Sequence, residues 1–288
     1  MLDLRRLRLL RELARRGTIA AVAEALSYSA SAVSQQLSTL EKEAGVQLLE
    51  PVGRRVRLTA QAEVLVAHAE VLLEEVERAE AALARSQHET VGTLRVAAFQ
   101  TAVLTLVPTA LTRLLRQHPG LRVEVTELES EVALPALIAG EFDVVLGEEY
   151  PGHPLPRLRE TERQDLFADE LRLVVPSAWR ERSLPRLAAR PFVMEPDGTT
   201  AREWSTAECR RAGFEPDVRY TSTDLRIHLR FVEHGLAAAL LPALSGASDH
   251  PATTTRRLPG APARTLFTTT RRSAGNHPKI QAFTAALR

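Results

Sequence analysis

Four short polar side chains recur at helical spacing near the start of the chain: Ser31, Ser34, Gln35 and Ser38. Residues three and four positions apart lie on one face of an α-helix, so these side chains are expected to point the same way. Serine and glutamine can hydrogen-bond to phosphate oxygens and to the edges of bases. The pattern therefore indicates a contact with double-stranded DNA, and Ser29 is placed to cap the same helix.

The surrounding segment is predicted to form two helices joined by a turn, with its core over 18–26, 27–29 and 32–40. Thr18 and Ser29 stand where a side-chain oxygen can accept from the free N–H groups of a first helical turn. The helix before them must end at Gly17, because glycine readily adopts the left-handed conformation of a C-cap. Each helix has one apolar face for a shared core, made of Ile19, Val22, Ala23, Leu26, Val33, Leu37 and Leu40.

The flanking residues complete a predicted winged head over 1–58. A leading helix over 2–16 is expected to expose its arginines and to bury one leucine face, made of Leu4, Leu7, Leu10 and Leu13. After the second helix, Gly53 opens a turn that is followed by alternating basic and apolar residues, a pattern typical of a short β-hairpin. Arg54 and Arg55 are expected on the outside of this wing, against the DNA backbone or in the minor groove.

Positive charge is concentrated in this head. Residues 1–58 hold ten Arg and Lys against six Asp and Glu, a difference of +4, whereas the whole chain has a net charge of +1. The alternative interpretation is a small helical domain with an ordinary solvated face. The wing and the charge both favour DNA binding, since phosphates attract such a surface.

Composition and length set the outer limits. The chain has 288 residues, 44% hydrophobic and 25% charged, which is ordinary for a globular protein of two or three units. There is no apolar run of membrane-spanning length and no secretory signal pattern, so we expect a cytoplasmic protein without a membrane partner. Cys209 is the single cysteine, which excludes an intrachain disulfide and indicates a buried thiol.

A long helix is predicted over 59–88, a segment without glycine or proline in which six acidic residues face two basic ones. Its apolar residues are spaced four, three, four, three and four apart, at Leu65, Ala69, Leu72, Val76, Ala79 and Leu83. This heptad spacing indicates packing against a partner helix, and thus a homo-oligomer built on a dimerisation helix. The alternative is a helix that lies on its own domain.

From 91 to 288 strands alternate with helices, which predicts an α/β domain with a parallel sheet. One β-α-β-α-β series runs over 93–147 and a second over 170–242. A last strand at 264–270 and a helix at 278–287 lead back to the first series. We expect two lobes, about 91–163 plus 265–288 and about 164–264, with a ligand cleft at the carboxyl ends of the strands.

Polar residues at predicted helix starts are candidates for this cleft. Gln100 and Thr101 follow the first strand, where free N–H groups can hold an anion. Thr199 and Thr200 open a helix of the second lobe, and Thr223 is expected to cap another. Helix capping alone is the alternative role for each. Together they predict a polar cleft with few charges, suited to a small carboxylate or a neutral metabolite as effector.

The chain resembles the LysR-type transcriptional regulators over nearly its whole length. The likeness is carried in the head by 17–26, 29–41, 48, 54–55 and 58–59, and further on by 92–96, 140–143, 235–237 and 241–242. The resemblance implies an all-α winged helix-turn-helix, a long linker helix and a two-lobed, periplasmic-binding-protein-like effector domain. It also implies a homotetramer whose DNA binding a small effector modulates. The family commonly has arginine where Gln35 stands, a difference that bears on base preference.

Two other classes of protein compete with a regulator. A solute-binding protein would account for the α/β domain but not for the head. An enzyme fused to a DNA-binding head would need a catalytic constellation. The sequence contains no His-Glu-x-x-His, no phosphate-binding glycine loop and no paired cysteines, so we expect no catalysis, no cofactor and no metal.

Overall fold

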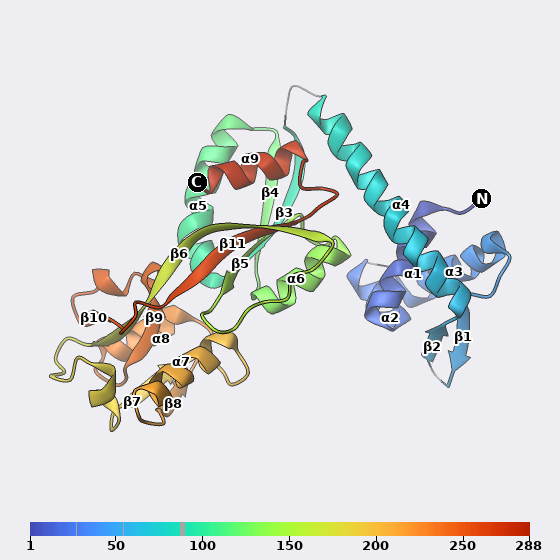
Figure 1. Cartoon of the computed structure of the whole chain (residues 1–288). Coiled ribbons are helices and arrows are strands. Elements are labelled where there is room, and N and C mark those ends of the chain that lie inside the picture. The colour runs from blue at the N-terminus through green and yellow to red at the C-terminus, as the bar shows by residue number, and fades with distance from the viewer. Residues whose placement is uncertain (27, 54, 87–89) are drawn as a thin grey trace.

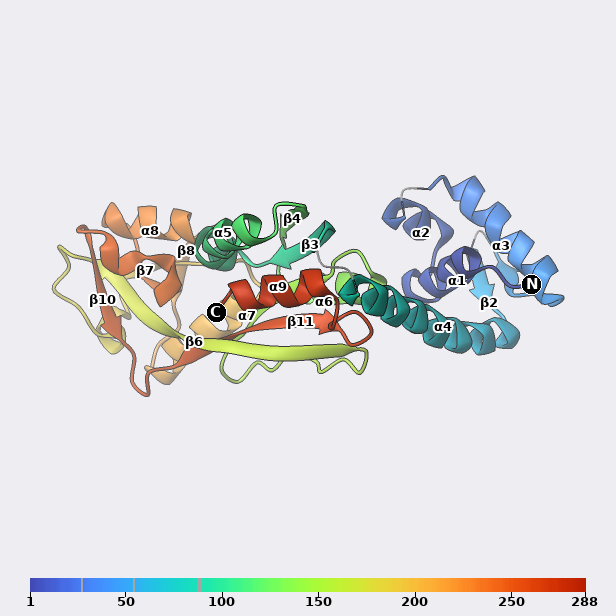
Figure 2. The same ribbon diagram turned by 90° about the horizontal axis from the view of Figure 1, so that it is seen from above.

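The structure is a computed structural model that describes residues 1–26, 28–53, 55–86 and 90–288. The N-terminal head lies at one end of the molecule, and the helix α4 (Ala60–Arg85) leads from it to an α/β domain (Figure 1). Seen from above, the second lobe, the first lobe and the head follow one another along an elongated chain (Figure 2). None of the described helices combines the length and apolar character that a bilayer crossing requires.

The head contains the predicted winged helix-turn-helix. Thr18 and Ser29 cap the second and third helices through hydrogen bonds to the N–H groups of Ala21 and Ala32, and Gly17 ends the first helix at φ +74°. Both caps and the C-cap were predicted from the sequence and are confirmed. The elements are α1 (Leu4–Arg16), α2 (Ile19–Ala25), α3 (Ala30–Ala44), β1 (Leu49–Val52) and β2 (Arg55–Leu58).

The core of the head differs from the expectation at one helix. Leu7, Leu10 and Leu13 are buried as predicted, but Leu4 is 42% exposed and Leu9 takes its place in the core. Leu4 begins the helix at the edge of the head, where no neighbouring element covers it. Glu12 is also fully buried, and its carboxylate accepts hydrogen bonds from Arg11 and Arg16.

Helix α4 confirms the predicted linker helix, but its apolar stripe divides between two roles. Leu65 and Ala69 pack into the core of the head, mostly against α1. Leu72 and Leu83, further along, are 46% and 68% exposed. The first part of the stripe thus covers the chain's own domain, and Leu72 and Leu83 remain exposed.

A seven-stranded mixed sheet forms the backbone of the α/β domain, in the order β10-β6-β11-β5-β3-β4, with β9 paired to β6. β3, β4 and β5 run parallel as expected, whereas β6 and β11 run antiparallel to their neighbours. The elements of the first lobe are β3 (Gly92–Ala98), α5 (Gln100–Gln117), β4 (Leu121–Glu127), α6 (Ser130–Ala139), β5 (Val144–Glu149), β11 (Ala263–Arg271) and α9 (Pro278–Ala286).

The second lobe has its own core around Phe192 and Trp204 and a separate two-stranded parallel sheet. Strand β10 was not predicted, because its five residues are threonines and arginines without an apolar alternation. The elements of this lobe are β7 (Pro191–Met194), α7 (Thr200–Arg211), β8 (Asp217–Thr221), α8 (Leu225–Glu233), β9 (Ala239–Pro242) and β10 (Thr253–Arg257), with short 3-10 turns at Leu184–Leu187, Ala243–Ser245 and Ala247–Asp249.

One strand joins the two lobes. β6 (Thr161–Pro176) begins nine residues before the strand that the sequence predicted at 170. Up to Glu170 it pairs with β11 of the first lobe, and from Leu171 it pairs with β9 of the second. Its first half was missed because the charged residues of 162–165 do not show the apolar pattern of a buried strand.

Truncation of Leu37, a buried residue of α3, should destabilise the head. Leu37 is 1% exposed and packs among the leucines of α1 and α3. We expect Leu37→Ala to lower the free energy of unfolding of the head by about 2–5 kcal/mol, because it leaves a cavity. Ser38→Ala, on the exposed face, should change it by less than about 0.5 kcal/mol. Urea unfolding followed by circular dichroism checks both, and equal losses would contradict the assigned core.

Candidate functional site

The candidate DNA-binding face lies on the outer side of α3. Ser31, Ser34, Gln35 and Ser38 are all exposed, as the spacing predicted, while the opposite side of the helix is buried in the core. The hydroxyl of Ser29 lies 3.0 Å from that of Ser31 and accepts from the N–H of Ala32. The helix N-terminus therefore presents two hydroxyls beside free N–H groups, an arrangement that suits a phosphate.

Arg6 adds polar contacts between α1 and α3 to the leucine core that the two helices share. Arg6 donates from Nε to the side chain of Gln36 at 2.9 Å and forms an ion pair with Glu43. Gln36 directly follows Gln35 in the chain but faces α1 rather than the solvent. This contact positions the exposed face of α3 relative to the rest of the head.

The wing is a two-stranded hairpin with Gly53 at φ +61° in its turn. Arg54 lies outside the described residues, and so does the side chain of Arg55, so both keep the role predicted from the sequence. Arg57 was not among the candidates although it belongs to the same basic pattern. Its side chain is 73% exposed and pairs with Glu50 at 2.8 Å, a surface ion pair that solvent screens and a phosphate can replace.

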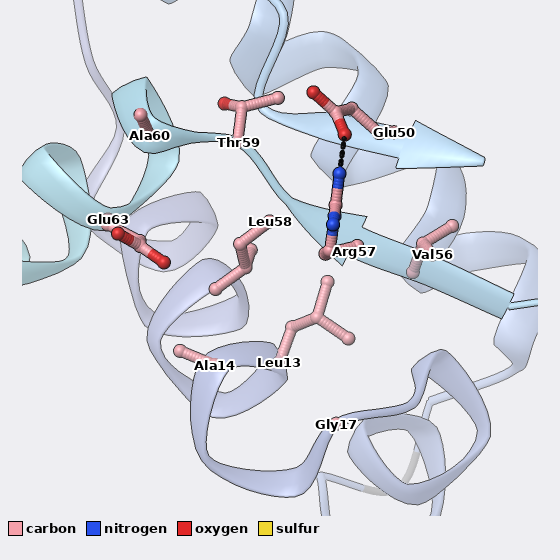
Figure 3. Close-up of a pocket in the computed structure, with 10 residues that line it drawn as sticks. All are labelled: Leu13, Ala14, Gly17, Glu50, Val56, Arg57, Leu58, Thr59, Ala60 and Glu63. Atoms are coloured by element: carbon pink, nitrogen blue, oxygen red, sulfur yellow. Dashed lines mark hydrogen bonds and ion pairs between the residues drawn. The ribbon is translucent and has the colours of Figure 1, made fainter. Parts of the chain in front are cut away.

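Beside this ion pair the head has an open hollow of about 510 Å³ between α1, β2 and the start of α4 (Figure 3). Glu63 of α4 and the Arg57–Glu50 pair form its polar part, and Leu13 and Leu58 line its apolar part. The charges at the hollow are already paired or acidic. It has no group of side chains that could do chemistry.

The candidate ligand site is a cavity of about 210 Å³ between the two lobes. It is lined where strands end and helices begin: after β4, β5, β7 and β8 and at the starts of α6 and α7. This is the position at which α/β sheets bind ligands. The lining residues are Glu129, Glu131, Glu148, Tyr150, Glu195, Gly198, Thr199, Thr200, Ala201 and Thr223.

The charge of this cavity contradicts the sequence-based expectation. A polar cleft with few charges was predicted, but four of the lining residues are glutamates and none is basic. The prediction failed because these glutamates follow different strands and meet only in the folded domain. The sequence does place Glu129 and Glu148 close to the ends of strands, and this position was the available indication of an acidic cleft.

A buried arginine lies beneath the cavity. Arg264 of β11 is 1% exposed, donates to Asp169 at 2.8 Å and to Thr101 at 2.6 Å, and forms an ion pair with Glu148. Burial lowers the pKa of Arg264, but Glu148, Tyr150 and Asp169 outweigh this effect and raise it, so the guanidinium stays charged. Its charge is shared among these partners, and it lowers the pKa values of Glu129 and Glu195 by less than burial and the neighbouring carboxylates raise them.

Two of those glutamates are held in an environment that opposes ionisation. Burial, together with the charges of Glu129 and Glu148, raises the pKa of Glu195 to about 8. Burial and Glu148 likewise raise the pKa of Glu129 to about 7, although Glu129 is the more exposed of the two. We therefore regard Glu195 as the carboxyl that stays protonated at neutral pH in the empty cleft.

The predicted effector residues fall into two groups. Thr199, Thr200 and Thr223 line the cavity, but Thr223 does not cap α8, since Asp224 occupies the N-cap and accepts from Arg226. Gln100 and Thr101 are buried behind the cavity. Gln100 accepts from the N–H of Leu225 at 2.9 Å across the lobes, and Thr101 accepts from Arg264.

Comparison with known proteins is consistent across sequence and structure. Residues 4–63 match the model of the bacterial regulatory helix-turn-helix proteins of the lysR family, and residues 87–288 match the LysR substrate binding domain. A hydrogen peroxide-inducible genes activator of Pectobacterium carotovorum subsp. carotovorum is 30% identical over 232 residues, covering 77% of this chain and 74% of that protein.

The chain belongs to the LysR family. It is a transcriptional regulator with a DNA-binding head and an effector-binding domain, and not an enzyme. The match of the head removes the alternative of a solute-binding protein without DNA binding. Among the described residues no cluster of three or more His, Cys, Asp or Glu side chains is arranged to hold a metal ion.

Further LysR-family proteins match along the whole chain. The regulator TcbR of Pseudomonas sp. (strain P51) is 25% identical over 289 residues and covers 100% of this chain and 98% of its own. Full-length OxyR from Pseudomonas aeruginosa superimposes with a TM-score of 0.69 at 22% identity, covering 100% and 95%. CbnR in complex with its target DNA has a TM-score of 0.54 at 25% identity, covering 100% and 99%.

The raised pKa of Glu195 predicts that the stability of the α/β domain depends on pH. The folded state binds this proton more tightly than the unfolded state, so the contribution is fully present below the ordinary carboxyl pKa of 4.5 and is lost as pH rises from there through 8. We expect Glu195→Gln to raise Tm by about 2–4 °C at pH 9, which corresponds to about 1 kcal/mol, and to leave it unchanged at pH 4. Glu160→Gln, in an exposed loop, is the control. An equal effect at both pH values would contradict the assignment.

Proposed function

We propose that this LysR-family regulator binds a two-fold-related promoter site as a homo-oligomer and responds to a small, positively charged effector in its cleft. Its functional units are a head over 1–58, a linker helix over 59–88 and an effector domain over 91–288. Within that domain, the change of partners along β6 supports a lobe boundary near Glu170, slightly beyond the 163–164 predicted from the sequence. DNA binding implies a cytoplasmic location.

The residues proposed to read DNA lie on α3 and the wing. Ser34 and Gln35 enter the major groove, where glutamine can pair with adenine through two hydrogen bonds. Ser29 and Ser31 bind phosphate at the helix N-terminus, and Ser38 extends the same exposed face. Arg54, Arg55 and Arg57 bind the backbone or the minor groove from the wing.

The open part of the stripe on α4 supports dimerisation. Leu72 and Leu83 of this stripe are 46% and 68% exposed. A second copy of the helix would cover them and hold two recognition helices at a fixed distance, as a two-fold-related site requires. We propose that two such dimers form the tetramer that the family resemblance implies.

The effector class is carried by one observation: four glutamates and no basic residue line the enclosed cleft. An anionic ligand would meet unfavourable charge there, whereas an amine or guanidinium group would pair with Glu131 and Glu195. Tyr150 is 6% exposed on the cavity wall, where its hydroxyl accepts from Arg264 and keeps its own proton for donation. It can therefore donate to a polar atom of the ligand. At about 30 Å³ per water, the cavity of about 210 Å³ holds a ligand of roughly seven non-hydrogen atoms.

Gln100 and Thr101 are proposed to position residues around the cavity rather than to contact the ligand. Thr101 helps hold Arg264, which in turn positions the carboxylate of Glu148, and Gln100 joins the lobes through Leu225. Thr199, Thr200 and Thr223 contribute hydroxyls to the cavity itself. Effector binding shifts the lobes only by its different affinity for their open and closed arrangements.

The peroxide response named for several relatives does not transfer to this chain on chemical grounds. The single cysteine, Cys209, is fully buried in the second lobe. Burial and the neighbouring Glu208 raise the pKa of its thiol to about 12. Reaction with peroxide requires an accessible thiolate, and this environment disfavours it.

DNA reading is tested by footprinting and gel shift on the DNA upstream of the protein's own gene, at two salt concentrations. We expect the unmodified protein to protect two half-sites. Ser34→Ala/Gln35→Ala should abolish this protection, since loss of the glutamine contact alone costs about 1–3 kcal/mol of discrimination at one base pair. Arg55→Gln should weaken all sequences alike and lower the salt slope by about one. Sequence-independent binding that ignores the double variant would refute the assignment of the face.

The effector class is tested by calorimetry with four matched probes at millimolar concentration: cadaverine, agmatine, glutarate and hexane-1,6-diol. We expect heat of binding from a cationic probe only. Glu131→Gln/Glu195→Gln should weaken it at least about tenfold, or ~1.4 kcal/mol, and Glu160→Gln should not. Binding at pH 7 should release a proton from Glu195, seen as a buffer-dependent enthalpy. Binding of glutarate in place of the amines would overturn the proposal.

A further inference from the structure

Helix α6 touches the ligand cleft with one end and the DNA-binding head with the other. The first turn of α6 carries Glu131, which lines the cavity. At the other end, Gly140 directly follows the helix and lies beside Arg8 of α1. Figure 1 shows the helix between the sheet of the first lobe and α1 and α2 of the head. With ten residues at 1.5 Å each, it spans about 15 Å.

The C-terminal end of α6 is completed by side chains from outside the helix. The last carbonyls of a helix lack partners within it and carry partial negative charge, so cations stabilise them. The last turn of α6 contains no basic residue of its own. Arg15 of the head donates to the carbonyl of Ile138 at 2.7 Å, and Arg271 of β11 donates to that of Leu137 at 2.8 Å.

Two further ion pairs bind the head and linker at the same place. Arg16, the last residue of α1, bridges the buried Glu12 of the head and Glu141 of the first lobe. Arg271 also pairs with Glu77 of α4 at 2.9 Å. The head and the linker helix are thus both fastened around the C-terminal end of α6.

The N-terminal end of α6 is fastened to the opposite lobe. Thr200, the first residue of α7, donates to the carboxylate of Glu131 at 2.7 Å. Ser130 accepts from the N–H of Glu148, which joins the same turn to the end of β5. Any ligand that occupies the cavity meets the Thr200–Glu131 hydrogen bond, since both residues line it.

We propose that α6 links the cleft to the head within one chain: occupancy of the cleft alters the Thr200–Glu131 contact, α6 shifts, and Arg15 and Arg16 are released or tightened. The body of the helix is packed on the sheet by Ala133, Leu134 and Leu137, against Ala97 and Val145. Movement of its first turn therefore reaches its last turn as a shift of the packed helix. Arg15 and Arg16 are positioning residues in this mechanism. This inference rests on the proposed function in one respect: its first test measures binding to DNA.

A double-mutant cycle on the full-length protein tests the link without any effector. The probe is a fluorescein-labelled duplex from the DNA upstream of the protein's own gene. Thr200→Val removes the cross-lobe hydroxyl, and Arg15→Gln/Arg16→Gln removes the contacts of the head with α6. We expect Thr200→Val to change Kd at least about fivefold in the unmodified background. In the Arg15→Gln/Arg16→Gln background the change should be less than about twofold.

Matched variants separate the link from general effects. Thr221→Val removes an exposed hydroxyl elsewhere in the second lobe, and Arg5→Gln removes one charge from α1 without touching the contacts with α6. Neither should alter the effect of Thr200→Val. Glu141→Gln breaks the Arg16 pair from the lobe side and should reproduce the uncoupling if the double arginine variant does not fold. The proposal would be overturned if Thr200→Val changed Kd as much in the Arg15→Gln/Arg16→Gln or Glu141→Gln background as in the unmodified protein. It would also be overturned if Thr200→Val did not change Kd in the unmodified protein.

Hydrogen exchange supplies a readout that does not need DNA. In the free protein, Thr200→Val should speed the exchange of backbone amides over 138–141 and 13–17, at the contact between α6 and α1. Unchanged exchange at both segments would refute the link, whatever the DNA result. If instead the unmodified protein binds the upstream duplex no better than a scrambled one, while exchange responds as expected, the proposed DNA site fails and the link stands.

Discussion

The effector domain depends on the burial of a single charge. Arg264 lies in the middle of the domain, where an unpaired guanidinium would cost several kcal/mol, and it is acceptable only because β5, β6 and α5 each supply an oxygen to it. The ends of these elements therefore have to converge on one point. That point is the floor of the cleft. The need to pair Arg264 thus fixes how these elements are arranged. It also brings carboxylates to the cleft, which gives the cavity its acidic lining.

The head obeys a different constraint, the need to bury a small apolar core with little chain. Caps at Thr18 and Ser29 and turns at Gly17 and Gly53 define its short elements, and the first part of α4 adds the surface that 58 residues lack. These features are local, with partners only a few residues apart. They were predicted correctly from the sequence for that reason, and so were the exposed polar side chains of α3.

Apart from the cap of α8, which is Asp224 and not Thr223, the features that the sequence did not predict depend on distant partners. Leu9 is buried in place of Leu4 because of where α1 meets its neighbours. Strand β10 forms because it pairs with β6, and its own composition does not favour a strand. The acidic cavity requires glutamates from the ends of three strands, and the contact of Arg15 with Ile138 joins residues 123 positions apart. Helix periodicity and capping rules contain no information about such encounters.

Strand β6 has a mechanical consequence for the lobes. Apart from one register shift opposite Leu266 and Phe267, its pairing passes directly from β11 in one lobe, up to Glu170, to β9 in the other, from Leu171, so the lobes are not separate bodies on a loose tether. A loose tether would permit wide swings in which many weakly ordered states compete. A shared hydrogen-bonded ladder permits mainly a change of twist, of small amplitude and along one coordinate. Motion confined in this way loses little entropy when a ligand stops it, and a compound of about seven non-hydrogen atoms is therefore large enough to select one arrangement.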